Sequence, residues 1–134
     1  MCILLVEDEF LIRLIVAEAL AEAGYAVCEA ESGDRAAVMI EARPDAFILL
    51  VTDIHMPGSR DGIAVAHFLR ERRPEVPVIY TTGRPGVLNG LRDGAGRLGH
   101  RAALVAKPFA PSELLAVVRR LLGEVGVNRA SGQA

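Results

Sequence analysis

Five short apolar runs recur along the chain, and segments with helical spacing separate them. The runs cover residues 2–6, 25–29, 46–52, 78–82 and 102–106. Most are apolar throughout instead of alternating, which is typical of strands that helices cover on both faces. Alternating strand and helix patterns indicate βα units and a parallel sheet. With right-handed crossovers, the pattern predicts an α/β fold with a doubly wound, five-stranded parallel sheet.

Each apolar run is followed by a segment that can form a helix. Gly24 ends the first of these segments, and Ser32 can cap the second. The last places apolar residues at i, i+1, i+3, i+4, i+7 and i+8, which is a core-facing stripe. We expect helices over residues 10–23, 34–42, 63–73, 85–92 and 111–122.

The fourth of these helices is the weakest prediction. Residues 83–100 include Gly83, Gly86, Gly90, Gly94, Gly96 and Gly99, and a glycine inside a helix costs about 1 kcal/mol relative to alanine. We therefore expect a short or mobile helix there, followed by a long loop. Residues 1–123 form a single expected domain, and residues 124–134 an expected flexible tail with little to pack against.

Composition narrows the class of protein. The 134 residues suit one domain, and 51% of them are hydrophobic. Charges or turn residues interrupt every apolar run before it could span a bilayer. The start, MCILLVEDE, has no basic region and is not a signal peptide, so we expect a cytoplasmic protein without a membrane partner. A net charge of −2 with interspersed signs argues against a nucleic-acid partner.

The cysteines and histidines show no metal-ligand spacing. Cys2 and Cys28 lie in apolar strand-like runs, which favours small buried side chains in a reducing compartment over a disulfide or a metal site. His55, His67 and His100 are expected on the surface or in loops.

Polar residues follow four of the five predicted strands. The first strand is followed by Glu7 and Asp8, the third by Asp53, the fourth ends at Thr82, and the fifth is followed by Lys107. In a doubly wound sheet the carboxyl ends of the strands share one edge, where ligands bind. Three acids, a hydroxyl group and one ammonium group are therefore expected to converge.

This combination is suited to phosphoryl transfer. Neighbouring carboxylates repel one another unless a cation lies among them, and hard oxygen ligands suit Mg²⁺. Asp53 can act as a nucleophile and become an aspartyl phosphate. Thr82 can donate a hydrogen bond to a phosphoryl oxygen, and Lys107 can neutralise developing charge. Of the 15 basic residues, Lys107 is the one lysine, which is consistent with a compact charge being needed there.

Each residue taken alone has a simpler interpretation. Glu7 and Asp8 could be solvated acids, and Asp53 could form an Asx-turn. Thr82 could be a strand residue and Lys107 a surface lysine. Their joint placement at strand ends favours the phosphoryl-acceptor hypothesis.

Four stretches carry a resemblance to a known family. In order and spacing, ILLVEDE, VTDIHMPGSRDG, VPVIYTTG and VAKPF resemble the motifs of bacterial two-component response-regulator receiver domains. The resemblance covers about residues 1–123 and is closest in kind to stand-alone, chemotaxis-regulator-like receivers.

The resemblance implies a flavodoxin-like (βα)5 receiver fold with strand order 2-1-3-4-5. It implies that a histidine kinase or phosphotransfer protein phosphorylates Asp53. Asp8 and Asp53 would ligate Mg²⁺ directly, Glu7 through water, and His55 through its backbone carbonyl. Lys107 and Thr82 would contact the phosphoryl group. The Lys107–Pro108 bond would be cis, which only an X-Pro bond tolerates cheaply.

Four features depart from the family pattern. The family's switch aromatic is replaced by Leu104, so the usual coupling of threonine and aromatic ring cannot operate in that form. The stretch MPGSRDG is one residue longer than the common spacing, and residues 83–100 are unusually rich in glycine. Ala110 occupies the cap position before Pro111, which forgoes about 1 kcal/mol of capping.

The leading hypothesis is a stand-alone phosphorylation-controlled signalling protein. It would catalyse only its own Mg²⁺-dependent phosphorylation and dephosphorylation, and would bind a downstream protein through the fourth-helix, fifth-strand and fifth-helix face. A homodimer and an effector domain in a longer chain stay open. The alternatives are a phosphorylation-independent interaction module and an aspartyl-nucleophile phosphatase, in which His55 replaces the expected second acid. Flavin binding is disfavoured because no phosphate loop follows the first strand.

Overall fold

The computed structural model describes residues 1–84 and 101–123 of the chain. Strands and helices alternate along it, as the apolar pattern predicts. The expected fourth helix over residues 85–92 and the tail over residues 124–134 lie outside the described residues. In chain order the elements are β1 (Cys2–Val6), α1 (Phe10–Glu22), β2 (Val27–Ala30), α2 (Gly33–Ala42), the 3-10 turn η1 (Pro44–Ala46), β3 (Phe47–Asp53), α3 (Gly62–Arg72), β4 (Val78–Thr82), β5 (Ala102–Ala106) and α6 (Pro111–Leu122).

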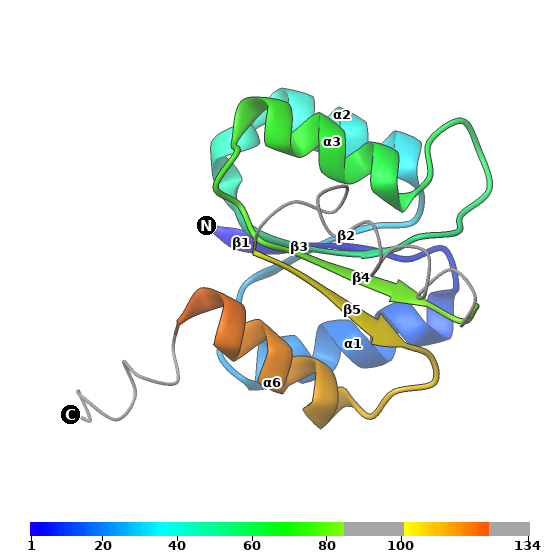
Figure 1. Ribbon diagram of the computed structural model, residues 1–134, viewed down its shortest axis with the longest axis vertical. Coiled ribbons are helices and arrows are strands. Elements are labelled where there is room, and N and C mark those ends of the chain that lie inside the picture. Colours follow the sequence, from blue (N-terminus) through cyan, green and yellow to red (C-terminus); the bar gives the residue numbers. More distant parts are fainter. Residues whose placement is uncertain (85–100, 124–134) are drawn as a thin grey trace.

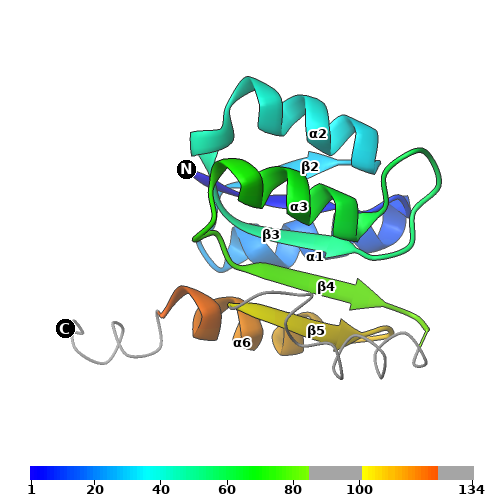
Figure 2. The ribbon, with the colours of Figure 1, turned by 45° about the horizontal axis from the view of Figure 1, so that its top comes forward.

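The five strands form one parallel sheet in the order β2-β1-β3-β4-β5. Figure 1 shows α2 and α3 over one face of the sheet and α1 and α6 over the other. Figure 2 shows the strands side by side, with β2 at one edge and β5 at the other. The strand order reverses between β1 and β3. The chain therefore leaves the carboxyl end of β1 toward α1 on one face of the sheet, and the carboxyl end of β3 toward α3 on the other face. The predicted doubly wound fold and strand order are confirmed.

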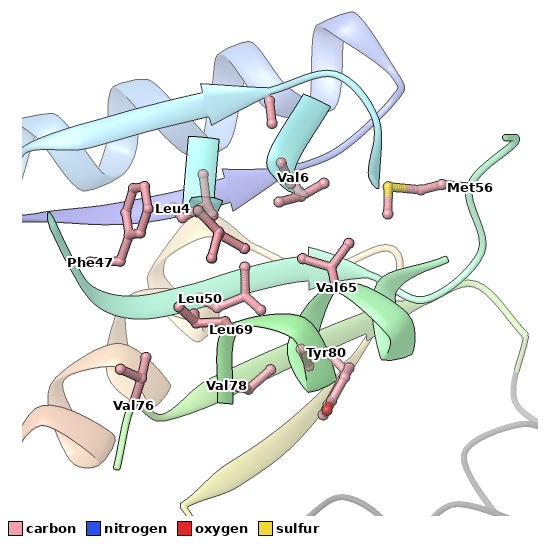
Figure 3. Close-up of a cluster of buried hydrophobic side chains, with 14 of the residues drawn as sticks. Leu4, Val6, Phe47, Leu50, Met56, Val65, Leu69, Val76, Val78 and Tyr80 are labelled. Carbon is pink, nitrogen blue, oxygen red and sulfur yellow. The ribbon is translucent and has the colours of Figure 1, made fainter. Parts of the chain in front are cut away.

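A separate apolar core fills each side of the sheet. Between the sheet and α2 and α3, Leu4, Leu50 and Tyr80 pack with Val65 and Leu69 (Figure 3). Alternate strand residues point to the other face and meet α1 and α6 in a second cluster that includes Ile3, Leu49, Ile79, Leu20 and Val118. Because both faces are covered, the central strands β1, β3 and β4 are almost wholly buried and mainly apolar.

Two strand boundaries differ from the prediction. The second strand begins at Val27 instead of residue 25, because Gly24 has a φ of +100° and the Tyr25 amide still bonds to the Leu20 carbonyl. The third strand begins at Phe47 because Pro44–Ala46 forms a 3-10 turn, and it extends to Asp53. The strand therefore ends on the acid itself.

Side chains and local turns fix where the helices begin. The Ser32 hydroxyl oxygen accepts a hydrogen bond from the Arg35 amide at 3.0 Å, as predicted. Asp61 caps α3 in the same way through the Ala64 amide at 2.9 Å. Ala110 offers no such cap, but the Glu113 side chain accepts a hydrogen bond from the Ala110 amide at 3.2 Å. The expected loss of capping at α6 is thus partly offset from inside the helix.

The surface of α1 is unusually apolar at its amino end. Phe10, Leu11 and Ile15 expose 62%, 68% and 52% of their surfaces, while Val16 and Leu20 face the core. Within residues 1–84 and 101–123, the helices are all too short or too polar to cross a membrane.

Candidate functional site

The carboxyl ends of β1 and β3 bring three acids together. Glu7 and Asp8 follow β1 directly, and Asp53 is the last residue of β3. One carboxylate oxygen from each of the three lies within 4.8 Å of the other two. Glu7 and Asp53 are buried, while Asp8 is exposed. The register that pairs Val6 with Thr52 creates this cluster, since it brings the ends of both strands to the same level.

Lys107 lies among these acids. It follows β5, and its Nζ donates to Glu7 Oε1 at 2.9 Å and to Asp53 Oδ2 at 3.0 Å. Its side chain is only 14% exposed, so this lysine is not a surface residue. The Lys107–Pro108 peptide bond is cis, as the resemblance implied. The ammonium group thus joins the ends of β1, β3 and β5.

Burial and charge act in opposite directions on these groups. Burial raises the pKa of Glu7, and the hydrogen bonds and charge of Lys107 only partly oppose it. Burial also lowers the pKa of Lys107, but the hydrogen bonds and charges of Glu7 and Asp53 outweigh it, so the pKa of Lys107 is raised overall. The ammonium group is therefore firmly protonated, whereas at Glu7 the effect of burial exceeds that of the Lys107 charge.

Two residues outside the predicted site brace Glu7. The Glu9 amide donates to Glu7 Oε2 at 3.1 Å, and the Arg13 guanidinium donates to the Glu7 carbonyl at 2.8 Å. The Glu9 carboxylate also lies 3.8 Å from Lys107 Nζ. The sequence analysis did not assign these roles. Helical spacing offered a signal, since Arg13 lies one turn after Glu9 and is polar within an apolar helix.

His55 and Thr82 flank the cluster at different positions. The His55 amide lies 3.4 Å from Asp53 Oδ1, in the Asx-turn pattern that the simpler interpretation of Asp53 required. The side chains of His55 and His67 are exposed, as expected. Thr82 is buried, and its hydroxyl oxygen accepts a hydrogen bond from the Arg84 amide at 3.1 Å. Its carbonyl accepts from the Lys107 amide at 2.7 Å, which ties β4 to the lysine loop.

A polar hollow begins at His55, two residues after Asp53. It is lined by residues 55–59 and Asp61 of the loop between β3 and α3, together with Ala64 and Arg84. Ser59 anchors this loop by donating a hydrogen bond to Asp34 of α2 at 2.6 Å, and Gly58 has a φ of +106° that favours glycine. The additional residue in MPGSRDG is thus accommodated in a loop held against α2.

The donor set fits a hard divalent cation. Three carboxylates from Glu7, Asp8 and Asp53 supply oxygen atoms only, and the cluster opens to solvent at Asp8. Mg²⁺ prefers such ligands and keeps several waters. Lys107 brings a single positive charge to these three carboxylates, so a divalent cation would relieve the repulsion that remains among them.

Comparisons with known proteins converge on one family. The family model described as response regulator receiver domain matches residues 3–119. The phosphate regulon transcriptional regulatory protein PhoB of Pseudomonas aeruginosa is 35% identical over 130 residues, which covers 92% of this chain and 52% of that protein. The response regulator receiver protein CpdR of Brucella abortus is 33% identical over 120 residues, covering 90% of this chain and 95% of that protein.

Solved structures agree with this match. A response regulator receiver protein from Sinorhizobium medicae superimposes with a TM-score of 0.81 at 30% identity, covering 92% of this chain and 94% of that one. The receiver domain of NtrX from Brucella abortus gives a TM-score of 0.77 at 33% identity, covering 90% and 98%. The chain spans about half the length of several transcriptional regulatory proteins that it matches.

Proposed function

The chain belongs to the response regulator receiver domain family of two-component systems, and from this premise we propose that Asp53 accepts a phosphoryl group. The supporting observation is the position of Lys107, whose Nζ lies 3.0 Å from Asp53 Oδ2 inside a cluster of three acids. A buried carboxylate next to a fixed ammonium group can act as a nucleophile toward phosphorus while the ammonium group receives the incoming negative charge.

Each residue of the site has a proposed role that depends on its position. Asp53 forms the new oxygen–phosphorus bond as the donor's phosphorus–nitrogen bond breaks, and the donor imidazole leaves. Lys107 holds Asp53 oriented and can transfer a hydrogen bond to a phosphoryl oxygen. Thr82 and the His55 carbonyl are proposed as further contacts to the phosphoryl group and the metal, respectively. Phosphoryl transfer asks for positioning and charge neutralisation.

Glu7, Asp8 and Asp53 are the residues that would hold Mg²⁺. When bound, the ion would neutralise negative charge on the transferred phosphoryl oxygens. The protein's own part is to keep the three acids at the ends of β1 and β3, with Arg13 and the Glu9 amide fixing the position of Glu7.

The donor is proposed to be a histidine kinase or a phosphotransfer protein. A protein donor must approach the edge of the sheet where Asp53 lies. The exposed apolar side chains of Phe10, Leu11 and Ile15 begin three residues after Glu7. An apolar hollow lined by Ile12, Ile15 and Phe109 also includes Lys107 and so adjoins the acids. This face of α1 is therefore the proposed contact for the donor.

The proposal is tested by labelling with acetyl phosphate and Mg²⁺. Wild type is expected to gain one phosphoryl group per chain, detected by intact-mass spectrometry, and the adduct should survive acid and be lost in base. Asp53→Asn should remain unlabelled, and so should wild type in EDTA. Labelling of Asp53→Asn to the wild-type extent would contradict the proposal.

A matched control separates this effect from a general loss of charge. Asp45 is an exposed acid in η1, which directly precedes the amino end of β3, whereas Asp53 lies at the carboxyl end of that strand. Asp45→Asn changes net charge by the same amount and should be labelled like wild type.

A second candidate is a phosphorylation-independent interaction module. Leu104 lies on β5 opposite Tyr80 of β4 and packs, partly buried, against the core beside α2 and α3. An aliphatic side chain there lacks the ring of the family's switch residue. If beryllofluoride and Mg²⁺ leave the NMR shifts of residues 101–106 unchanged while those around Asp53 move, this candidate is preferred.

The wider role follows the same family premise. We propose a cytoplasmic signalling protein that alters its contacts with a downstream protein or a second copy on phosphorylation. β5 and α6 supply the described part of the proposed output face.

A further inference from the structure

The thiols of Cys2 and Cys28 lie in contact toward the amino ends of β1 and β2, whereas the acid cluster lies at the carboxyl ends of the strands. Cys2 begins β1 and Cys28 lies in the edge strand β2. Their Sγ atoms are 2.6 Å apart, whereas a disulfide bond is about 2.05 Å long. Both side chains contact the core on the α2 side of the sheet. The sequence favoured two small buried side chains over a disulfide or a metal site, and it could not show that the fold places the two sulfurs in contact.

The pair is reachable from solvent. Cys2 is only 7% exposed, but Cys28 is partly exposed. Both cysteines line a hollow at this end of the strands, together with Met1, Arg43 and Asp45. A small oxidant can therefore approach Cys28 first, with Cys2 directly behind it.

From this geometry we propose that Cys2 and Cys28 form a redox-active dithiol that closes to an intramolecular disulfide on reaction with a hydroperoxide. The Cys28 thiolate attacks the terminal peroxide oxygen, the O–O bond breaks, and the alcohol or water leaves with a proton. Cys28 is then a sulfenic acid. The Cys2 sulfur attacks Cys28 Sγ, the S–O bond breaks, and the departing hydroxide takes the Cys2 proton as water. Two thiols are oxidised and one peroxide is reduced.

The environments of the two sulfurs agree with this order. Burial raises the pKa of the Cys2 thiol to about 12, and the hydrogen bond and charge of Cys28 add to the effect, against a smaller opposite effect of the N-terminal amine and Arg43. Cys2 is therefore the less reactive thiol toward the oxidant, and it gives up its proton only to the hydroxide that leaves Cys28 Sγ as the Cys2 sulfur attacks. Cys28, on the accessible side, meets the oxidant.

This site is separate from the phosphoryl chemistry. Cys2 lies at the amino end of β1, whereas the acids follow the carboxyl ends of β1 and β3, so the two sites lie at opposite ends of the parallel strands. The disulfide would link β1 to the edge strand β2 across a sequence separation of 26 residues. Such a link restricts the unfolded chain, so the oxidised domain should be the more stable form.

Peptide mapping tests the proposal directly. The reduced protein is treated with hydrogen peroxide, alkylated and digested with trypsin, which cleaves after Arg13 and Arg35. We expect peptides 1–13 and 14–35 to appear joined, with a mass lower than their sum by two hydrogen atoms, and to separate on reduction. Thermal unfolding of the oxidised protein should shift upward by roughly 5 °C. Cys28→Ser should lose both the joined peptide and the shift.

Comparison with the unfolded chain shows whether the fold directs the pairing. In buffers of a small thiol and its disulfide, the native protein should require at least about tenfold more reductant to open half of the disulfide than the chain in urea. Equal requirements in the two states, alkylation of both cysteines after peroxide treatment, or exclusively intermolecular linkage would overturn the proposal. Asp53→Asn should form the joined peptide like wild type, so failure here is distinct from failure of phosphorylation.

Discussion

At the scale of single residues, Lys107 is the point on which the candidate site depends. It donates to Glu7 and Asp53, and both of these carboxylates are buried. A buried carboxylate that loses its cationic partner becomes an uncompensated charge, which costs far more than the pair contributes as a whole.

Replacing this lysine should therefore destabilise the metal-free domain. We expect Lys107→Met to lower the free energy of unfolding by about 3 kcal/mol in EDTA, measured by urea denaturation at pH 7. Lys107→Arg keeps the charge and should lose much less. Equal stability of Lys107→Met and wild type would show that the ammonium group does not compensate the acids in the folded domain.

At the scale of elements, most of the fold was predictable because each element carries its own signal. The strands β1, β4 and β5 have the predicted bounds, since each of these apolar runs is followed directly by a charged residue or a glycine. The errors at β2 and β3 lie where a local turn competes with strand pairing. The Tyr25 amide is still bonded to α1, and Pro44–Ala46 winds into a 3-10 turn.

The residues of the candidate site that follow strands were predictable from the sequence, but the contacts between different elements were not. Strand exits place Glu7, Asp8, Asp53 and Lys107 at one edge whatever the details of packing. Contacts that cross between elements have no sequence signal of this kind. The bracing of Glu7 by Arg13 depends on how α1 lies over the sheet, and the Cys2–Cys28 contact depends on the register of β1 and β2.

The close approach of α3 to β3 gives a prediction at this scale. A Cβ on Gly62 would overlap the carbonyl oxygen of Asp53, which is backbone and cannot move aside freely. Gly62→Ala should therefore lower the free energy of unfolding by about 3 kcal/mol, measured by chemical denaturation.

Gly83 provides the matched control for that substitution. It follows β4 near the same edge, and a Cβ there would meet no heavy atom within 4 Å. Gly83→Ala should stay within about 0.5 kcal/mol of wild type. A Gly62→Ala variant as stable as Gly83→Ala would show that α3 has room to shift away from β3.

At the scale of the whole molecule, the acid cluster exists only in the folded chain. Glu7 and Asp8 are more than forty residues from Asp53 in sequence, and the pairing of β1 with β3 brings them together. A cation that needs all three should therefore bind the native state and not the unfolded one.

Mg²⁺ should accordingly stabilise the domain as a whole. At a Mg²⁺ concentration 100 times the dissociation constant, the free energy of unfolding should rise by about 2.7 kcal/mol, seen as a higher melting temperature by circular dichroism. Asp8→Asn should lose this gain, whereas Glu22→Gln, at an exposed position on α1, should retain it. A gain of the same size in Asp8→Asn would place the ion elsewhere.

The apolar patch at the start of α1 can change in sequence independently of the nucleophile Asp53 and of Lys107. Leu11 and Ile15 lie outside both cores, so substitutions there should affect folding and the acids little, whereas the Phe10 ring contacts Arg13, which braces Glu7. A lineage could exchange these side chains to gain or lose a signalling partner in few mutational steps, while the nucleophile and its lysine stay unchanged. After a gene duplication, substitutions at a few surface positions can therefore be enough for the two copies to bind different partners.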